Sequence, residues 1–173
     1  MTQTATRLLL SDVTVGDSLP SLSYDVTATT VVVGALATRD WRPQHHDYHF
    51  ATERNGVKNI FLNSPNQLAW FERYVTDWTG PTGRVGYLSF RMIDSIFPGD
   101  TMVFTATVTN VETDELGCGW AEVDIAVKVG DKVCTTCKGR VALPTSPDDN
   151  PWSRRGETWV PQPRRGEDQK PRA

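Results

Sequence analysis

The strongest constraint on the fold of this chain is one amphipathic helix pattern that precedes a long run of strand patterns. Asn63 and Ser64 place polar side chains before Pro65, a combination that suits the first turn of a helix. Gly80 and Pro81 supply the residues that end one. Between them, four apolar residues repeat at helical spacing: Leu68, Phe71, Val75 and Trp78. The pattern predicts a helix of about four turns whose apolar stripe is core.

After this helix, apolar and polar residues alternate, which is the period of a half-buried strand. The predicted strands cover residues 85–91, 101–112, 120–129 and 132–143. Turn-forming residues separate them at 97–100, 114–117 and 130–131. Upstream, residues 24–37 are rich in Val, Thr and Ala and predict a strand followed by a short helix or loop. One helix with an antiparallel meander is an α+β fold.

Composition limits the classes of protein that this chain can belong to. Its 173 residues, 38% of them hydrophobic, fit one domain with a core that needs neither metal nor disulfide. The formal net charge of -3 argues against a nucleic-acid partner. No apolar run is long enough to span a membrane or to form a signal peptide. We therefore expect a cytoplasmic protein that is not bound to membranes.

The three cysteines do not form a recognisable metal or redox centre. Cys134 and Cys137 form a CxxC pair inside a predicted strand, where a spacing of three sends two side chains to opposite faces. Only Cys118 remains, so a four-cysteine zinc site is excluded. We expect reduced thiols buried in strands.

The chain changes character at Pro144, after which prolines and charges of both signs dominate. We therefore divide it into a domain, residues 1–143, and a C-terminal tail, residues 144–173. We expect the fold to survive removal of residues 148–173. Trp152 and Trp159 leave open whether part of the tail packs on the domain or on another subunit.

Residues 38–51 contain all three histidines of the chain together with two aspartates. Their spacing, Asp-x-x-Pro-x-His-x-Asp-x-x-x-Ala, is formed by Asp40, Pro43, His45, Asp47 and Ala51. It resembles the hydratase motif of the MaoC-like family, with Arg42 where that motif has asparagine. The likeness extends from residues 13–17 through the capped helix to residues 98–100 and the final strands. Residues 37–40, 45–47 and 73–78 are also similar to small subunits of actinobacterial enoyl-CoA hydratases of steroid side-chain breakdown.

This resemblance implies a hot-dog fold, in which an antiparallel sheet wraps around one long helix. It also implies a homodimer, or a heteromer with a second MaoC-like subunit, with an acyl-thioester pocket at the subunit interface. The likeness to small subunits favours the heteromer. The substrate would be a 2-enoyl group on coenzyme A or acyl carrier protein, and the product an (R)-3-hydroxyacyl thioester.

Hydration of a 2-enoyl thioester takes a proton from water at C3 and delivers one at C2, so a carboxylate and an imidazole suffice. We assign these roles to Asp40 and His45, with no metal or redox cofactor. Charge that develops on the thioester oxygen would be received at the N-terminus of the predicted helix. Asn63 and Ser64 are the candidates there, although the family usually has a glycine amide at this place.

Several alternatives remain open at this level. Asp40 could cap a turn and His45 could be a core residue, and the histidine cluster with Asp47 could bind a metal. We expect His46 and His49 to be structural or surface residues. Other functions are dehydration of a 3-hydroxyacyl carrier protein in lipid synthesis, and a non-catalytic hot-dog subunit that shapes a partner's pocket. A hot-dog thioesterase would use a carboxylate such as Glu72 on the helix, but would leave Asp40 without a role.

Overall fold

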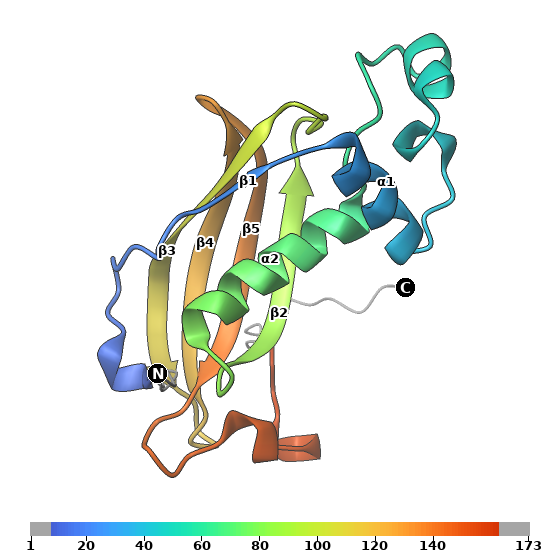
Figure 1. The fold of residues 1–173 in the computed structure, drawn as a ribbon. Coiled ribbons are helices and arrows are strands. Elements are labelled where there is room, and N and C mark those ends of the chain that lie inside the picture. The colour runs from blue at the N-terminus through green and yellow to red at the C-terminus, as the bar shows by residue number, and fades with distance from the viewer. Residues whose placement is uncertain (1–7, 163–173) are drawn as a thin grey trace, which may run out of the picture.

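The computed structural model describes residues 8–162. One antiparallel sheet contains β1 (Leu22–Asp25), β2 (Arg84–Met92), β3 (Thr101–Thr113), β4 (Gly119–Val129) and β5 (Lys132–Leu143). The strand order is β1-β3-β4-β5-β2. The helix α2 (Ser64–Thr79) crosses one face of the sheet, and α1 (Ala28–Ala37) lies beside its N-terminal end (Figure 1). This is the predicted α+β hot-dog arrangement, and the four predicted strands end within one residue of the observed bounds.

The helix α2 begins and ends where its sequence predicts. The side chain of Asn63 accepts a hydrogen bond from the amide of Asn66, Pro65 lies in the first turn, and Gly80 ends the helix with φ 69°. Its 16 residues amount to about four turns. Within residues 8–162, no helix has the length and hydropathy that crossing a membrane requires.

The apolar stripe of α2 is only partly core, which corrects one prediction. Phe71 and Val75 are fully buried, but Leu68 is 37% exposed. Successive helix positions are about 100° apart, so Gln67 faces the sheet in place of its neighbour. The Gln67 side-chain carbonyl accepts a hydrogen bond of 2.7 Å from the hydroxyl of Thr135 on β5. The helix therefore meets the sheet through a buried polar contact as well as through apolar side chains.

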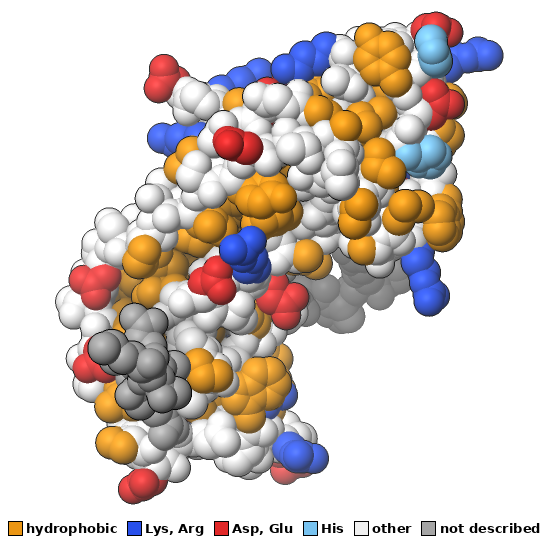
Figure 2. All heavy atoms as spheres, viewed as in Figure 1, with side chains coloured by type: hydrophobic (Ala, Val, Ile, Leu, Met, Phe, Trp, Pro, Cys, Tyr) orange, Lys and Arg blue, Asp and Glu red, His pale blue; other side chains and the backbone are white. Residues whose placement is uncertain are grey.

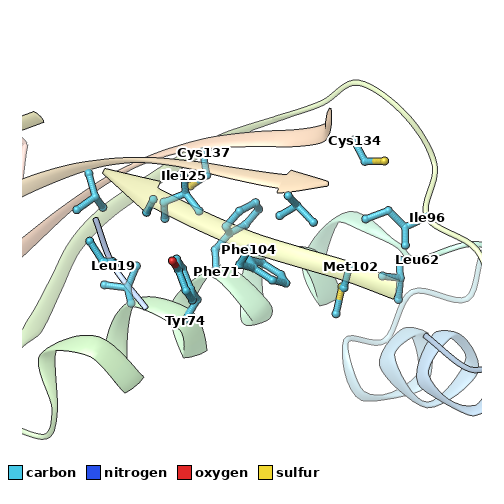
Figure 3. Packing of buried hydrophobic residues seen from close by; sticks show 14 of the residues in the cluster. Leu19, Leu62, Phe71, Tyr74, Ile96, Met102, Phe104, Ile125, Cys134 and Cys137 are labelled. Carbon is cyan, nitrogen blue, oxygen red and sulfur yellow. The ribbon is translucent and has the colours of Figure 1, made fainter. Parts of the chain in front are cut away.

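Aromatic side chains join the helix to the sheet (Figure 3). Phe71 on α2 meets Phe104 on β3 edge to face, with ring centroids 5.6 Å apart, and Tyr74 packs on the same ring at 5.6 Å. Ile125 on β4 and Cys137 on β5 extend this core across the sheet. Rings packed in this way add about 0.5–1.5 kcal/mol per pair beyond their area burial.

All three cysteines are free and buried, as expected. Burial raises the pKa of Cys118 to about 11 and that of Cys137 to about 12, which keeps both as unreactive thiols. Cys134 and Cys137 belong to the same core, and β5 has an extra residue at Cys134 where its register with β4 shifts. The regular alternation that would place the two sulfurs on opposite faces is therefore interrupted.

Part of the stretch after β5 packs against the domain, which is one of the arrangements that Trp152 and Trp159 left open. Residues 163–173 lie outside the described part. The Trp159 ring lies on Trp120 with a centroid distance of 5.1 Å. The Arg84 guanidinium stacks on Trp159 at 3.6 Å and donates hydrogen bonds to two carbonyls of the segment. We call residues 150–162 the C-terminal strap; its two short helical turns lie beyond the lower end of the sheet in Figure 1.

Candidate functional site

Asp40 is positioned by the way α1 ends. Its amide donates to the carbonyl of Ala35 at 2.9 Å, and the amide of Arg39 donates to that of Leu36 at 3.1 Å. These paired bonds form a Schellman motif, which requires a left-handed residue between the helix and Asp40. Arg39 takes this conformation with φ 54°, and within residues 8–162 no other non-glycine residue has a positive φ. The carboxylate therefore follows directly from a fixed helix terminus.

His45 is positioned by a proline-initiated turn. Arg42 is extended, with ψ 127°, and a single 3₁₀ turn, Pro43–His45, follows it, as the proline predicts. The rest of the motif is structural: the Asp47 carboxylate accepts the amide of Phe50, and Ala51 is fully buried. The 3₁₀ turn buries the side chain of His45, which is only 4% exposed.

The two side chains meet as their spacing suggests. His45 Nε2 lies 3.6 Å from Asp40 Oδ2. His45 Nδ1 donates a hydrogen bond of 2.7 Å to the carbonyl of Phe61, and the Phe61 ring packs edge-on at 4.9 Å. In the neutral imidazole, a proton on Nδ1 leaves Nε2 as an acceptor. Two acceptors that face each other across this distance are suited to share the two hydrogens of one water molecule.

Asn63 also lies beside Asp40, but its side chain binds the carboxylate and not, as predicted, the thioester oxygen of the substrate. Its Nδ2 donates to Asp40 Oδ2 at 3.0 Å and to the hydroxyl of Thr38 at 2.8 Å, while its Oδ1 caps the amide of Asn66. The side chain is buried, with 1% exposure for the residue. A carboxamide that is engaged on every side cannot also bind a thioester oxygen, so the side chain of Asn63 is corrected to a support of Asp40.

Ser64 retains the features of an oxyanion donor. It begins α2, Pro65 has no amide to donate, and the amide of Asn66 is occupied by the cap. Within the described residues, no hydrogen bond involves the amide of Ser64. This amide therefore stands free at the positive end of the helix dipole, on a partly buried residue.

The surroundings of Asp40 favour its ionised form. Burial alone would raise its pKa, but hydrogen bonds from the Asn63 side chain and the Arg42 amide, with the electrostatic influence of nearby His45 and Arg42, outweigh burial. The net result is a pKa below the usual value for aspartate. Asp40 is therefore available as a base at neutral pH.

The other candidates lie apart from this centre. His46 and His49 are exposed, as expected, and His49 pairs with Glu53 on its own helical turn at 3.1 Å. Residues 8–162 contain no cluster of three potential metal ligands. Glu72, the thioesterase candidate, is exposed on α2. Thr38 and Phe61 were missed, and Phe61 contributes only a backbone carbonyl, which no side-chain pattern reveals.

The hollow lined by Phe61, the residue whose carbonyl accepts from His45, is too small for an acyl-CoA. A cavity of about 220 Å³ is lined by Phe61, Leu62 and Gln67 together with residues 92–95 at the end of β2. Ligand pockets usually enclose about 300–1,000 Å³. Hydrophobic and histidine side chains share the exposed surface at this end of the molecule (Figure 2). The cavity at Phe61 is therefore smaller than a usual ligand pocket, and larger hollows of about 630 and 460 Å³ are lined by other residues of the chain.

Comparisons with known proteins agree on one group. The chain is 38% identical over 97 residues to the beta subunit of 3-oxo-4,17-pregnadiene-20-carboxyl-CoA hydratase of Mycobacterium tuberculosis. The matched residues amount to 56% of this chain and 74% of that subunit. The solved ChsH1-ChsH2 complex of the same organism contains a chain that matches with 31% identity and a TM-score of 0.69, covering 75% of this chain and 98% of that one. A MaoC-like dehydratase from Rhodospirillum rubrum matches in fold, with 18% identity, a TM-score of 0.71, and coverage of 81% and 99%. No family model matches the chain.

Proposed function

The chain belongs to the family of MaoC-like hydratases, and on this basis we propose that it is a subunit of an enoyl-CoA hydratase in which Asp40 and His45 add water to a 2-enoyl-CoA. The observation that carries the proposal is the buried pair itself, with Nε2 and Oδ2 3.6 Å apart. The chain is a hydro-lyase, the class of enzyme to which its hydratase and dehydratase relatives belong.

The pair can move both protons of the reaction. A water molecule that donates one hydrogen to Asp40 Oδ2 and one to His45 Nε2 keeps its lone pairs for C3 of the substrate. As the C3–O bond forms, one water proton passes to the pair and the double-bond electrons move toward the thioester oxygen. The pair then returns a proton to C2, which restores both groups and completes the addition of one water. Such acid–base assistance contributes about 10² to 10⁴ in rate, and no metal or redox cofactor enters this scheme.

The amide of Ser64 would stabilise the enolate oxygen that forms during the addition. An oxyanion donor of this kind contributes about 10² to 10³ in kcat. The free amide at the first turn of α2 supports this role because the cap on Asn66 and the proline leave Ser64 to provide the donor. The helix dipole acts in the same direction.

We assign a bulky steroid-type acyl group to the substrate. This assignment is supported by the relative from Mycobacterium tuberculosis, which is 38% identical and is a subunit of a hydratase of a pregnadiene carboxyl-CoA. The expected product is the (R)-3-hydroxyacyl-CoA, and the expected location is the cytoplasm.

The test is an assay of hydration with the chain alone and with a second hot-dog subunit from the same organism. We expect conversion of 3-oxo-4,17-pregnadiene-20-carboxyl-CoA to its hydrated product, and weaker activity toward the short substrate crotonyl-CoA. Mass spectrometry would detect the addition of water. Release of free coenzyme A without hydration would contradict the proposal and indicate a thioesterase, and activity restricted to an acyl carrier protein substrate would indicate a dehydratase of lipid synthesis.

We further propose that the pocket is completed by that second subunit. Among the described residues, the edge strand β2 pairs with β5 alone. Three exposed apolar residues lie on it and on elements that adjoin it: Leu68, Met92 and Ile93. A free strand edge bordered by apolar side chains favours pairing with another chain. The cavity beside Phe61 opens at the same end of β2, so a subunit seated there would also enlarge the pocket.

Charge placed on this surface should prevent assembly. We expect Ile93→Asp to weaken association with the second subunit by about tenfold or more, because it buries an unpaired carboxylate. The matched control is Val15→Asp, which changes an equally exposed valine that adjoins β3. Light scattering of the mixed subunits measures the effect. A fully active monomer, or equal assembly by both variants, would contradict this interface.

A further inference from the structure

The carboxamide of Asn63 is fixed in one orientation by its three partners. Both Nδ2 hydrogens are engaged, at 3.0 Å to Asp40 Oδ2 and at 2.8 Å to the Thr38 hydroxyl, and Oδ1 accepts the amide of Asn66 at 3.3 Å. A flipped amide would turn its oxygen toward the carboxylate and its hydrogens toward the Asn66 amide. Both contacts would be repulsive, so the network defines the orientation.

Thr38 gives this network its direction. Its hydroxyl donates to the carbonyl of Gly34 at 2.7 Å, which commits its single hydrogen to the backbone of α1. The oxygen is then an acceptor toward Asn63. The two helices are in close contact here, since a Cβ on Gly34 would meet the Asn66 side chain. The hydrogen bonds thus run from the end of α1 through Asn63 to the first turn of α2.

The carboxylate of Asp40 is only partly used by the protein. An ionised carboxylate has about four acceptor positions. Asn63 occupies one on Oδ2, and the amide of Arg42 occupies one on Oδ1 at 3.3 Å. Within residues 8–162, no further donor to this carboxylate is found, so the remaining positions, including one on the oxygen next to His45, can bind water. The supports therefore fix the carboxylate without blocking it.

We propose that Asn63, held by Thr38, is a positioning residue that ties the Asp40 carboxylate to the N-terminus of α2 and keeps its free lone pair directed at the water shared with His45. This inference rests on the proposed function. It gives Asn63 a role in holding the Asp40 carboxylate, in addition to capping α2 and distinct from binding the substrate. Because one side chain caps the helix and holds the carboxylate, Asp40 and the Ser64 amide keep a constant separation.

The proposal has a consequence for pH dependence. The titratable and charged groups that face Asp40 are His45 and Arg42, and its carboxylate accepts hydrogen bonds from the Asn63 side chain and the Arg42 amide. Loss of the Asn63 donor removes an interaction made only with the ionised carboxylate, so the pKa of Asp40 rises. Activity that needs this carboxylate ionised should then disappear at a higher pH on the acid side of the profile.

Two variants separate positioning from capping. Asn63→Asp keeps an N-cap but replaces the donor to Asp40 with a second carboxylate, whereas Asn63→Ser keeps a cap and one donor. We expect Asn63→Asp to lose about tenfold or more in kcat, with a smaller change in KM and an acid limb moved to higher pH. We expect Asn63→Ser to retain most of the activity, and Thr38→Val to show a weaker form of the Asn63→Asp effect.

Carbon-13 NMR titration of the Asp40 carboxylate provides a readout that needs no substrate. We expect its midpoint to move to higher pH in Asn63→Asp, and less so in Asn63→Ser. An unchanged midpoint in both variants, with kcat within about twofold of wild type, would overturn the proposal and leave Asn63 as a helix cap only. Asp40→Asn serves as the separate test of function: if it hydrates enoyl-CoA normally, the proposed active site fails, whatever the titration shows.

Discussion

Asp40→Asn should lower kcat for enoyl-CoA hydration by a factor of about 10² or more while the protein stays folded. The substitution preserves shape but removes the base that faces His45 Nε2 at 3.6 Å. His45→Ala should cause a loss of similar size, because it removes the second acceptor for the same water. Circular dichroism and light scattering would establish that each variant is folded and assembled before its kcat is compared.

The double variant provides the sharper result. If both groups hold one water, either loss already disables it, and the double variant should be little slower than the slower single variant. Additive losses would instead indicate two independent roles. A folded, assembled Asp40→Asn protein with a near wild-type rate would show that residues 40–45 are only a structural turn.

The parts of the site that the sequence predicts are those that local residues determine. Proline at 43 predicts the turn that carries His45, and the cap and stop residues of α2 predict both of its ends. The motif spacing brings Asp40 and His45 together because α1 ends in a compact motif and the 3₁₀ turn follows at once. The catalytic roles of the two residues stay predictions until variants are measured.

The parts that the sequence did not predict depend on contacts between distant residues. Thr38 and Asn63 are 25 positions apart, and neither side chain shows in a periodic pattern that it meets the other. Leu68 was assigned to the core from its spacing, but the sheet accepts Gln67 because Thr135 offers it a hydrogen bond. Helical periodicity locates an apolar face to within about one position, and tertiary partners decide which residue is buried.

The C-terminal strap shows the same limitation. Trp159, which is half-buried, lies 39 positions beyond Trp120 in the chain, yet its ring covers a residue that is fully buried. Composition correctly marks the stretch as rich in proline and charge, but it cannot show that Arg84 stacks on the tryptophan. Arg140, with 3% of its side chain exposed, stacks on the same Trp120 ring at 4.6 Å and pairs with Glu112 at 2.8 Å. The outer face of the sheet therefore has a small core of its own.

Removal of residues 148–173 should destabilise the domain by about 3–5 kcal/mol, because it uncovers the Trp120 side chain and removes carbonyl partners of Arg84. For a domain of this size, such a loss lowers Tm by about 10 °C. Trp159→Ala should reproduce a large part of the shift, since it deletes the ring between Trp120 and Arg84. Trp152→Ala is the comparison variant: this tryptophan of the same strap is 55% exposed, and it donates to the carbonyl of Gly83 at 3.2 Å and lies 5.3 Å from the Arg84 guanidinium, so its loss should matter less than that of Trp159. Differential scanning calorimetry of the four proteins gives the answer: a truncated chain that melts with the full chain would mean that the strap, despite its contacts, is a dispensable tail.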